Sequence, residues 1–402
     1  MNLIPRFARK EYFDYFPCNL IRKPMQLGIL KEPAFENRVS MLPETVAALT
    51  KQQVQVVIEQ GAGLQAWVPD EAYQQAGATV VSREEALASQ VVLSIQAPEP
   101  ADIAAMKPDT VLVGLFQPLF EPQLMQEWAL RGLVIFSMDF IPRTTRAQSM
   151  DVLSSQANIA GYKAVLTAAN AYPHYFPMFM TAAGSIAPAK VLILGAGVAG
   201  LQAIATAKRL GAVVEVFDTR PAVKEEVMSL GAKFVEVEGA ADASKAGGYA
   251  VEQNDDYQQR QQQKIKEHII KSDVVITTAQ IPGKRAPLLV TDDMIAGMKP
   301  GSVIVDIAAA TGGNTAGTRN NETVIHHGVI IIGNSALPSA MPNDASKLYG
   351  KNVFNFLKLM LTPEGGLSLN FEDDIVKGTC IAHQNQLVQE RVLALLTTGV
   401  NA

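Results

Sequence analysis

Short apolar runs alternate with amphipathic stretches along most of the chain. Between residues 25 and 138 the apolar runs predict five strands: QLGIL (26–30), VQVVIE (54–59), VVLSI (91–95), TVLVGLF (110–116) and LVIFSM (133–138). The intervening segments repeat apolar residues at helical spacing, for example in 42–51 and 122–131. Strands that alternate with helices predict a parallel sheet covered by helices.

A second series of apolar runs begins after Lys190. Its six members are VLIL (191–194), VVEVF (213–217), FVEV (234–237), VVIT (274–277), VIVDI (303–307) and VIII (329–332). Six strands with helical connections are typical of a complete doubly wound dinucleotide-binding domain. Between the two series, residues 162–179 are expected to contain a helix that crosses between the domains, with a plain core helix as the alternative interpretation.

The segment after Pro342 predicts where the C-terminus goes. In ASKLYGKNVFNFLKLML, apolar residues recur at helical spacing at Leu348, Val353, Phe356, Leu357 and Met360. We interpret this helix as a return of the chain to the first domain. The expected fold class is α/β, with two Rossmann-like doubly wound domains, the second inserted in the first, and a cleft between them. The expected divisions are a first domain of 25–162 completed by 343–402, and a nucleotide-binding domain of 163–342.

Two stretches depart from this alternation. Residues 1–24 are basic and aromatic, but Glu11 and Asp14 interrupt any apolar core of a signal peptide. We interpret them as a flexible leader or as translation from too early a start. Residues 239–264 are small, polar and low in complexity, and they include Tyr249 directly after two glycines. Such a long loop is usually functional or disordered, and the sequence leaves both interpretations open.

Composition narrows the class of protein. A chain of 402 residues exceeds one typical domain, and its net charge of −5 argues against a nucleic-acid partner. Two cysteines cannot form a disulfide framework and no Cys/His cluster has zinc spacing, so we expect a reducing, cytoplasmic setting and no metal site. No run of about 20 continuous apolar residues is present, so direct membrane insertion is not expected.

The motif GAGVAG follows the strand VLIL directly and precedes the helical run LQAIATAKRL. Gly195 permits a tight turn, Gly197 lets the backbone approach a pyrophosphate, and Gly200 lets the helix pack closely on the strand. The start of the helix offers free N–H groups and a positive dipole end to phosphates. Strand, glycines and helix in this order predict dinucleotide binding.

An acidic residue ends the next strand. Asp218 lies 23 positions after Gly195, where a carboxylate accepts hydrogen bonds from ribose hydroxyls and repels a 2′-phosphate. This arrangement favours NAD over NADP. Arg220 lies two residues further on and could bind a phosphate, but Asp218 holds the usual deciding position.

A polar block, PRTTRAQSMDVLSSQANIAGY (142–162), precedes the nucleotide-binding domain. Gln148, Asp151 and Ser154 are three residues apart, so they could share one helical face or line one loop. Arg143 with Asp151 would supply the donor and the acceptor that a nicotinamide carboxamide needs. A helix cap with solvated charges explains the same residues equally well.

Groups for proton transfer are missing from the predicted cleft. A dehydrogenase that oxidises an alcohol or amine needs a general acid or base near its substrate, and we find no convincing His or Lys there. A hydride passed between two nicotinamides moves no proton and needs only position and orientation. The sequence therefore favours transfer between nucleotides.

Five segments together resemble the alanine dehydrogenase/transhydrogenase family. They are VLILGAGVAGLQAIATAKRLGA, FDTRPAVKEEV, TTAQIPGKRAP, GSVIVDIAAATGGN and TRAQSMDVLSSQANIAGYKAV. The resemblance spans residues 25 to about 382, and the PRTTRAQSMD block is specific to the proton-translocating (Re/Si-specific) transhydrogenase branch. It implies a separate NAD(H)-binding subunit that exchanges hydride with NADP(H) on a partner subunit. It also implies membrane-spanning alpha-2 and beta subunits, a homodimer, and a peripheral position on the cytoplasmic side of the inner membrane.

The resemblance also implies roles for individual residues. Arg143, Gln148 and Asp151 would be the catalytic residues, and with Ser154 they would hold the nicotinamide and its ribose. Asp218 would contact the adenosine ribose, and the 239–264 loop would close over NAD(H) through Tyr249. The full set of implied contacts is Arg143, Gln148, Asp151, Ser154, Gly195, Gly197, Val198, Gly200, Asp218, Thr219, Arg220, Gly248, Tyr249 and Ala279.

The sister branch of the family provides a test within the sequence. Alanine dehydrogenases carry a lysine, a histidine and an aspartate at the positions that match Ser94, Gln117 and Ala310 here. None of these three side chains can bind a substrate carboxylate or move a proton. This departure argues against a self-contained amino-acid dehydrogenase, which stays as the alternative, and a non-catalytic NAD-binding sensor or scaffold is the third hypothesis.

Overall fold

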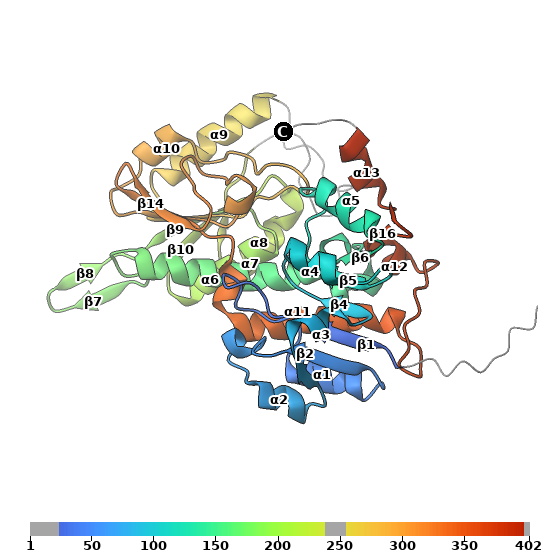
Figure 1. Cartoon of the computed structure of the whole chain (residues 1–402). Helices are drawn as coiled ribbons and strands as arrows, with labels where there is room; N and C mark the ends of the chain where they lie inside the picture. Colours follow the sequence, from blue (N-terminus) through green and yellow to red (C-terminus); the bar gives the residue numbers. More distant parts are fainter. Residues whose placement is uncertain (1–23, 238–254, 398–402) are drawn as a thin grey trace, which may run out of the picture.

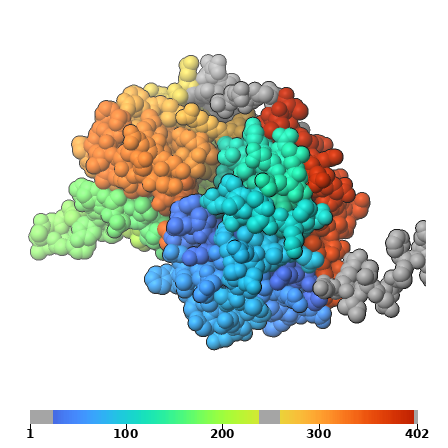
Figure 2. Space-filling view, in the orientation of Figure 1, coloured from blue at the N-terminus to red at the C-terminus, as the bar shows by residue number. Residues whose placement is uncertain are grey.

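Two parallel sheets with helices on their faces form the molecule (Figure 1). The computed structural model describes residues 24–237 and 255–397. Figure 2 shows a lobe from the N-terminal third of the chain, blue to cyan, beside a lobe from the second half, yellow to orange. The predicted α/β class with two Rossmann-like sheets is confirmed.

The first sheet has the strand order β17-β16-β6-β5-β4-β1-β2-β3. Six strands are parallel: β1 (Gln26–Ile29), β2 (Gln55–Glu59), β3 (Thr79–Val81), β4 (Val91–Leu93), β5 (Val111–Gly114) and β6 (Val134–Ser137). Near the C-terminus, β16 (Cys380–His383) and β17 (Gln386–Leu387) add to the edge at β6 in antiparallel fashion. Neighbouring residues of one strand enter different cores, as Val92 and Leu93 do, because helices cover both faces.

The second sheet repeats this plan with the order β11-β10-β9-β12-β13-β15-β14. Its strands are β9 (Lys190–Leu194), β10 (Val213–Phe217), β11 (Lys233–Phe234), β12 (Val274–Thr277), β13 (Val303–Asp306), β14 (Glu322–His326) and β15 (Val329–Gly333). All pairs are parallel except β14 with β15. All six apolar runs predicted from 191 onward are strands of this sheet, β11 being shorter than its run.

The helices lie around the two sheets. Around the first are α1 (Pro43–Thr50), α2 (Asp70–Gln75), α3 (Arg83–Leu87), α4 (Pro100–Ala105), α5 (Pro122–Leu130), α12 (Asp374–Thr379) and α13 (Glu390–Thr397). Around the second are α7 (Val198–Arg209), α8 (Lys224–Ser229), α9 (Asp255–Ile269) and α10 (Asp292–Ala296). Short 3-10 turns are η1 (Leu64–Ala66), η2 (Met138–Phe140), η3 (Thr145–Met150), η4 (Pro221–Val223), η5 (Ala309–Thr311), η6 (Leu337–Ala340) and η7 (Lys358–Met360).

Two longer helices connect the lobes. α6 (Val152–Ala171) leads from the first sheet to the second, and α11 (Pro342–Leu357) leads back, and the two pack together. α6 also packs extensively on α7. A Cβ atom on Gly161 of α6 would lie 2.0 Å from the backbone oxygen of Ala199, so the two helices approach as closely as glycine permits.

A hairpin projects from the second lobe. It consists of β7 (Phe179–Thr181) and β8 (Gly184–Ile186), and it extends away from the rest of the molecule (Figure 1). Apolar side chains on and just before it are exposed, and the rings of Tyr175 and Phe179 stack with centroids 5.1 Å apart. The exposed set is Tyr175, Met178, Phe179, Met180 and Ile186.

Several expectations about elements need correction. The helix expected within 162–179 begins at Val152 and ends at Ala171, because Asp151 caps its start and Pro173 disfavours helical geometry in the residue before it. Residues 255–264 belong to α9, so the predicted 239–264 loop is too long. Leu348 is 39% exposed, and the neighbouring Tyr349 takes the buried position on α11 instead.

The sequence pattern missed the short strands β3, β7, β8, β14, β16 and β17. β17 has two residues, and β3, β7 and β8 have three each, which is too few for a period-two pattern to emerge. β14 has largely exposed side chains and is polar at both ends, since it is the edge of its sheet.

Candidate functional site

The glycine motif forms a tight turn at the carboxyl end of β9. Gly195 has φ +105°, and a Cβ atom there would lie 2.4 Å from Thr278 Oγ1. A Cβ atom on Gly200 would lie 1.9 Å from the Gly195 oxygen, so this position also excludes any side chain. A Cβ atom on Gly197 would meet nothing within 4 Å. The space in front of Gly197 and of the exposed Val198 is therefore open to a ligand at the start of α7.

Asp218 lies against this turn. The residue is 9% exposed, and its carboxylate accepts a hydrogen bond of 2.7 Å from the backbone N–H of Ala196. The same carboxylate pairs with the Arg220 guanidinium at 2.8 and 2.9 Å, which raises the pKa of Arg220. The structure thus brings Asp218 and Arg220 together beside the glycine turn, with Thr219 partly exposed between them. A bound ribose would have to share this carboxylate with Arg220.

The end of β12 closes the other side of the turn. Thr278 Oγ1 donates to the backbone oxygens of Leu194 and Gly195, at 3.2 Å to each. Ala279 is fixed by the buried Asn314, whose side chain accepts from the Ala279 N–H at 3.0 Å and donates to its oxygen at 2.9 Å. Sequence reasoning missed Asn314 as a positioning residue. The signal was the run TGGN (311–314), which follows β13 at the same end of the sheet.

The polar block forms a pocket of about 260 Å³ just before α6. Its volume suits a ring-sized group better than a whole dinucleotide, since ligand sites commonly occupy about 300–1,000 Å³. Arg143 and Gln148 are exposed, and the Gln148 side chain has no hydrogen-bonding partner within the described ranges. The lining residues are Pro142, Arg143, Thr144, Thr145, Ala147, Gln148 and Asp151.

Asp151 caps helix α6. Its carboxylate accepts from the Ser154 backbone N–H at 2.9 Å and from the Ser154 hydroxyl at 2.6 Å. The cap predicted as one of two interpretations therefore exists, and it leaves the Asp151 carboxylate at the pocket wall. Arg146 does not line the pocket, because it forms ion pairs with Asp373 and Asp374.

Helix α6 links this pocket to the glycine turn. Asp151 lies ten residues before Gly161, which is about 15 Å along a helix axis. Gly161 contacts the first turn of α7, and Asn158 donates to Gln202 Oε1 at 3.3 Å nearby. One helix, α6, therefore joins the pocket to the N-terminal end of α7.

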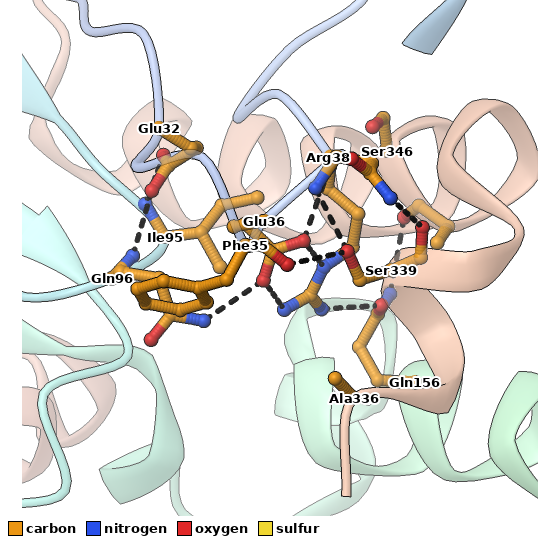
Figure 3. Close-up of polar contacts among 12 residues, drawn as sticks. Glu32, Phe35, Glu36, Arg38, Ile95, Gln96, Gln156, Ala336, Ser339 and Ser346 are labelled. Carbon is orange, nitrogen blue, oxygen red and sulfur yellow. Dashed lines mark hydrogen bonds and ion pairs between the residues drawn. The ribbon is translucent and has the colours of Figure 1, made fainter. Parts of the chain in front are cut away.

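A buried polar network also contacts the N-terminal part of α6 (Figure 3). Arg38 forms a two-pronged ion pair with Glu36, at 2.8 Å from Nε and 2.6 Å from Nη2, and donates to Gln156 of α6 at 2.8 Å. Burial raises the pKa of Glu36, but the hydrogen bonds and charge of Arg38 outweigh it and lower the pKa overall. Gln96 donates to the same carboxylate at 2.8 Å.

Glu32 lies beside this network at the carboxyl ends of β1 and β4. Burial raises its pKa to about 7, although its carboxylate accepts backbone hydrogen bonds from Ile95 at 2.6 Å and Gln96 at 3.0 Å. Sequence reasoning did not identify Glu32, Glu36 or Arg38. Their only signal was a group of four charged residues, Lys31 among them, within 31–38 directly after a buried strand.

Some expected positions lie elsewhere. Gly248 and Tyr249 fall outside the described residues, as does the expected leader up to residue 23. Ser94 is buried and its hydroxyl donates to the Gln96 oxygen at 2.7 Å. Gln117 has φ +49° in the segment after β5, and Ala310 is exposed in η5. Among the described helices, none combines the length and the apolar character needed to span a bilayer.

The fold and the site define an α/β protein in which a dinucleotide-binding sheet is joined to a second Rossmann-like sheet with its own pocket. Family models specify the class further: the alanine dehydrogenase/PNT N-terminal domain matches residues 28–160 and the C-terminal domain matches residues 164–390. The chain belongs to the alanine dehydrogenase/PNT family.

Individual relatives agree with this assignment. The chain is 41% identical over 353 residues to NAD(P) transhydrogenase subunit alpha of Haemophilus influenzae, covering 87% of this chain and 69% of the relative. The crystal structure of transhydrogenase from Sinorhizobium meliloti matches with a TM-score of 0.83 at 44% identity, covering 90% of this chain and all of that one. A structure of L-alanine dehydrogenase matches with a TM-score of 0.77 at 25% identity, covering 93% and 99%.

Proposed function

We propose that this chain is the NAD(H)-binding subunit of a proton-translocating NAD(P)+ transhydrogenase and passes hydride between NADH and NADP+ held by a partner subunit. One observation carries the proposal. Among the described residues, no histidine, lysine or cysteine lines the pocket beside α6, and its carboxylate, Asp151, is engaged in a helix cap. Such a pocket suits a step that moves hydride without a proton.

The residues of the chain would act by position. When bound, NADH supplies the hydride. The glycine turn would hold its pyrophosphate, since the space at Gly197 is open and the N–H groups of α7 face it. Arg143, Gln148 and Asp151 with Ser154 would orient the nicotinamide end, because all four lie at the pocket or in the cap beside it.

Nucleotide choice would follow from Asp218. Its carboxylate lies against the glycine turn, where a 2′-phosphate would meet negative charge. The remaining implied contacts, Thr219, Arg220 and Ala279, border the same turn, and we propose that Gly248 and Tyr249 close over it. We also propose that 163–342 is the nucleotide-binding domain, inserted between 25–162 and 343–402.

We propose membrane-spanning alpha-2 and beta subunits as partners, which would place this chain on the cytoplasmic side of the inner membrane. NADP(H) would bind to a partner subunit, and proton translocation would take place in the membrane subunits. We also propose a homodimer. Its support is the exposed apolar set on the projecting hairpin β7–β8, because apolar patches of this kind mark protein interfaces.

The decisive experiment mixes the chain with an NADP(H)-binding partner subunit and follows hydride transfer from NADH in single-turnover mode. Transfer supports the proposal. NADH binding without transfer would indicate a sensor or scaffold, and NAD+-dependent oxidation of alanine by the chain alone would indicate an amino-acid dehydrogenase.

Gln148→Asn sharpens this test. It keeps the amide but shortens its reach, and a displacement of about 1 Å can slow transfer on the order of 100-fold. We expect transfer to slow far more than NADH binding weakens. Transfer at the wild-type rate would show that Gln148 has no role in orienting the ring.

A further inference from the structure

Two adjacent histidines lie at the tip of the hairpin that ends the second sheet. His326 is the last residue of β14 and pairs in register with Val329 of β15. His327 and Gly328 form the two-residue connection, with φ +50° and +78°. Two successive positive φ values are typical of a tight hairpin turn, so the backbone beneath both imidazoles is closely defined.

Asp292, the first residue of α10, faces both rings. Its Oδ1 contacts His326 Nε2, and its Oδ2 lies 3.2 Å from His327 Nε2. The two ring centroids are 4.2 Å apart, and the potential ligand atoms of all three residues lie within 4.8 Å of one another. Across 24–237 and 255–397, no other group of three His, Cys, Asp or Glu side chains meets this condition.

One of these distances matches the separation between two ligands of a metal ion. Zn²⁺ binds nitrogen and oxygen ligands at about 2.0–2.2 Å, so two ligand atoms of a tetrahedral site are about 3.3 Å apart. The 3.2 Å between Asp292 Oδ2 and His327 Nε2 agrees with that separation. The histidine side chains are 39% and 41% exposed, so an ion can reach the site from solvent.

The chemistry of the ligands selects the ion. Two imidazoles and a carboxylate suit Zn²⁺, Co²⁺, Ni²⁺ or Cu²⁺, whereas Mg²⁺ and Ca²⁺ prefer oxygen ligands only. Three protein ligands leave a fourth position for water. Lys266 pairs with the neighbouring Asp293 at 2.7 Å, which leaves the Asp292 carboxylate to the histidines.

We propose that Asp292, His326 and His327 form a binding site for a divalent transition-metal ion, with Zn²⁺ as its representative. The site is separate from the glycine turn and from the α6 pocket, and it joins α10 to the edge hairpin. The sequence spacing did not reveal it, because Asp292 lies 34 residues before His326 and only folding brings them together.

The test is a titration of the full-length protein, without a histidine tag, with Co²⁺ and then with Zn²⁺ as competitor. We expect one Co²⁺ to bind with the visible absorption of a low-symmetry site, and Zn²⁺ to displace it. Asp292→Asn, His326→Gln and His327→Gln should each weaken binding at least about tenfold, since even outer partners contribute roughly 10–100-fold.

His174→Gln is the matched control, because His174 is exposed and lies outside this group. It should bind Co²⁺ as the wild type does. The proposal is overturned if the three site variants also bind like the wild type, or if no binding occurs at millimolar Zn²⁺. Circular dichroism of each variant shows that loss of binding is not loss of folding.

Discussion

The two sheets have the same core strand order, but they differ in what lies in the crevice at the carboxyl ends of their first and fourth strands. In each, the first strand lies between the second and the fourth, and the crevice at the carboxyl ends of the first and fourth strands is where ligands bind in this architecture. At β9 the chain makes a glycine turn and leaves space in front of Gly197. At β1 it continues into a segment whose own charged side chains, Glu32, Glu36 and Arg38, occupy the crevice.

The difference shows that the sheet topology places a crevice at this position, and that the local sequence decides whether the crevice is open to a ligand. Glycines with no side chains leave one crevice open, whereas an internal ion pair fills the other and connects it to Gln156 of α6. The filled crevice thereby supports the helix that carries the pocket. Four predictions test this contrast.

The largest effect is expected from Arg38→Met. Removing the guanidinium leaves the buried Glu36 carboxylate without its ion-pair partner, which should lower the free energy of unfolding by about 3–5 kcal/mol. Urea unfolding measures this value. The control is Arg319→Met, which removes an exposed pair with Glu322 and should change it by less than about 1 kcal/mol. Equal losses of unfolding free energy in the two variants would show that the buried ion pair contributes no more to stability than the exposed pair.

The pH dependence of stability tests Glu32. Its pKa is about 7 in the folded chain against an ordinary value of 4.5, so between these values the folded state binds more protons than the unfolded state. Stability should therefore fall as pH rises from about 4.5 to 7 and level off above, by about 3 kcal/mol in total.

Glu32→Gln isolates this contribution. Asp139 is also buried with a raised pKa, and it contributes with the same sign in the wild type and in the variant. The difference between the two unfolding curves across pH is therefore the quantity to measure. A constant difference from pH 4.5 to 7 would show that Glu32 has the same pKa in the folded and the unfolded chain.

Two alanine substitutions separate structure from binding in the open crevice. Gly200→Ala places a methyl group 1.9 Å from the Gly195 oxygen and should destabilise the fold by about 1–3 kcal/mol. Gly197→Ala meets no protein atom within 4 Å, so it should leave the melting temperature unchanged but weaken NADH binding. Calorimetry measures NADH binding by both variants, and thermal melting measures their stability. If Gly197→Ala binds NADH as the wild type does, the ligand does not occupy the open space in front of Gly197.

The smallest effect concerns nucleotide choice. Asp218→Asn removes the charge at the turn and leaves Arg220 without its carboxylate, so the preference for NADH over NADPH should narrow by roughly tenfold, or about 1.4 kcal/mol. Competition binding measures the ratio. Asp273→Asn is the control, since Asp273 is also 9% exposed but bonds the backbone of Lys190, at the opposite end of β9. A similar change in the preference for NADH over NADPH in both variants would show that Asp218 does not determine nucleotide choice.

Much of the fold was accessible from the sequence because strands in a parallel sheet are buried on both faces. Their continuous apolar runs, such as VLIL and VIVDI, stand out from their surroundings. β14 and β17 were missed because they are the outermost strands of their sheets, and such strands are short or exposed and lack this pattern. The start of α6 was misplaced because its first turns carry polar residues that bind Asp151, Asn352 and Arg38.

The site divides in the same way. By itself the sequence determined the glycine turn, since Gly195 and Gly200 are required by contacts within a few residues of the motif or across one neighbouring strand, and it placed Asp218 at the end of the next strand. Only the tertiary structure decided that Asp218 pairs with Arg220, that Asn314 fixes Ala279, and that Arg38 holds α6 through Gln156. These contacts join residues whose side chains could pair in several ways, and burial selects one arrangement because an unpaired polar group inside the protein is costly.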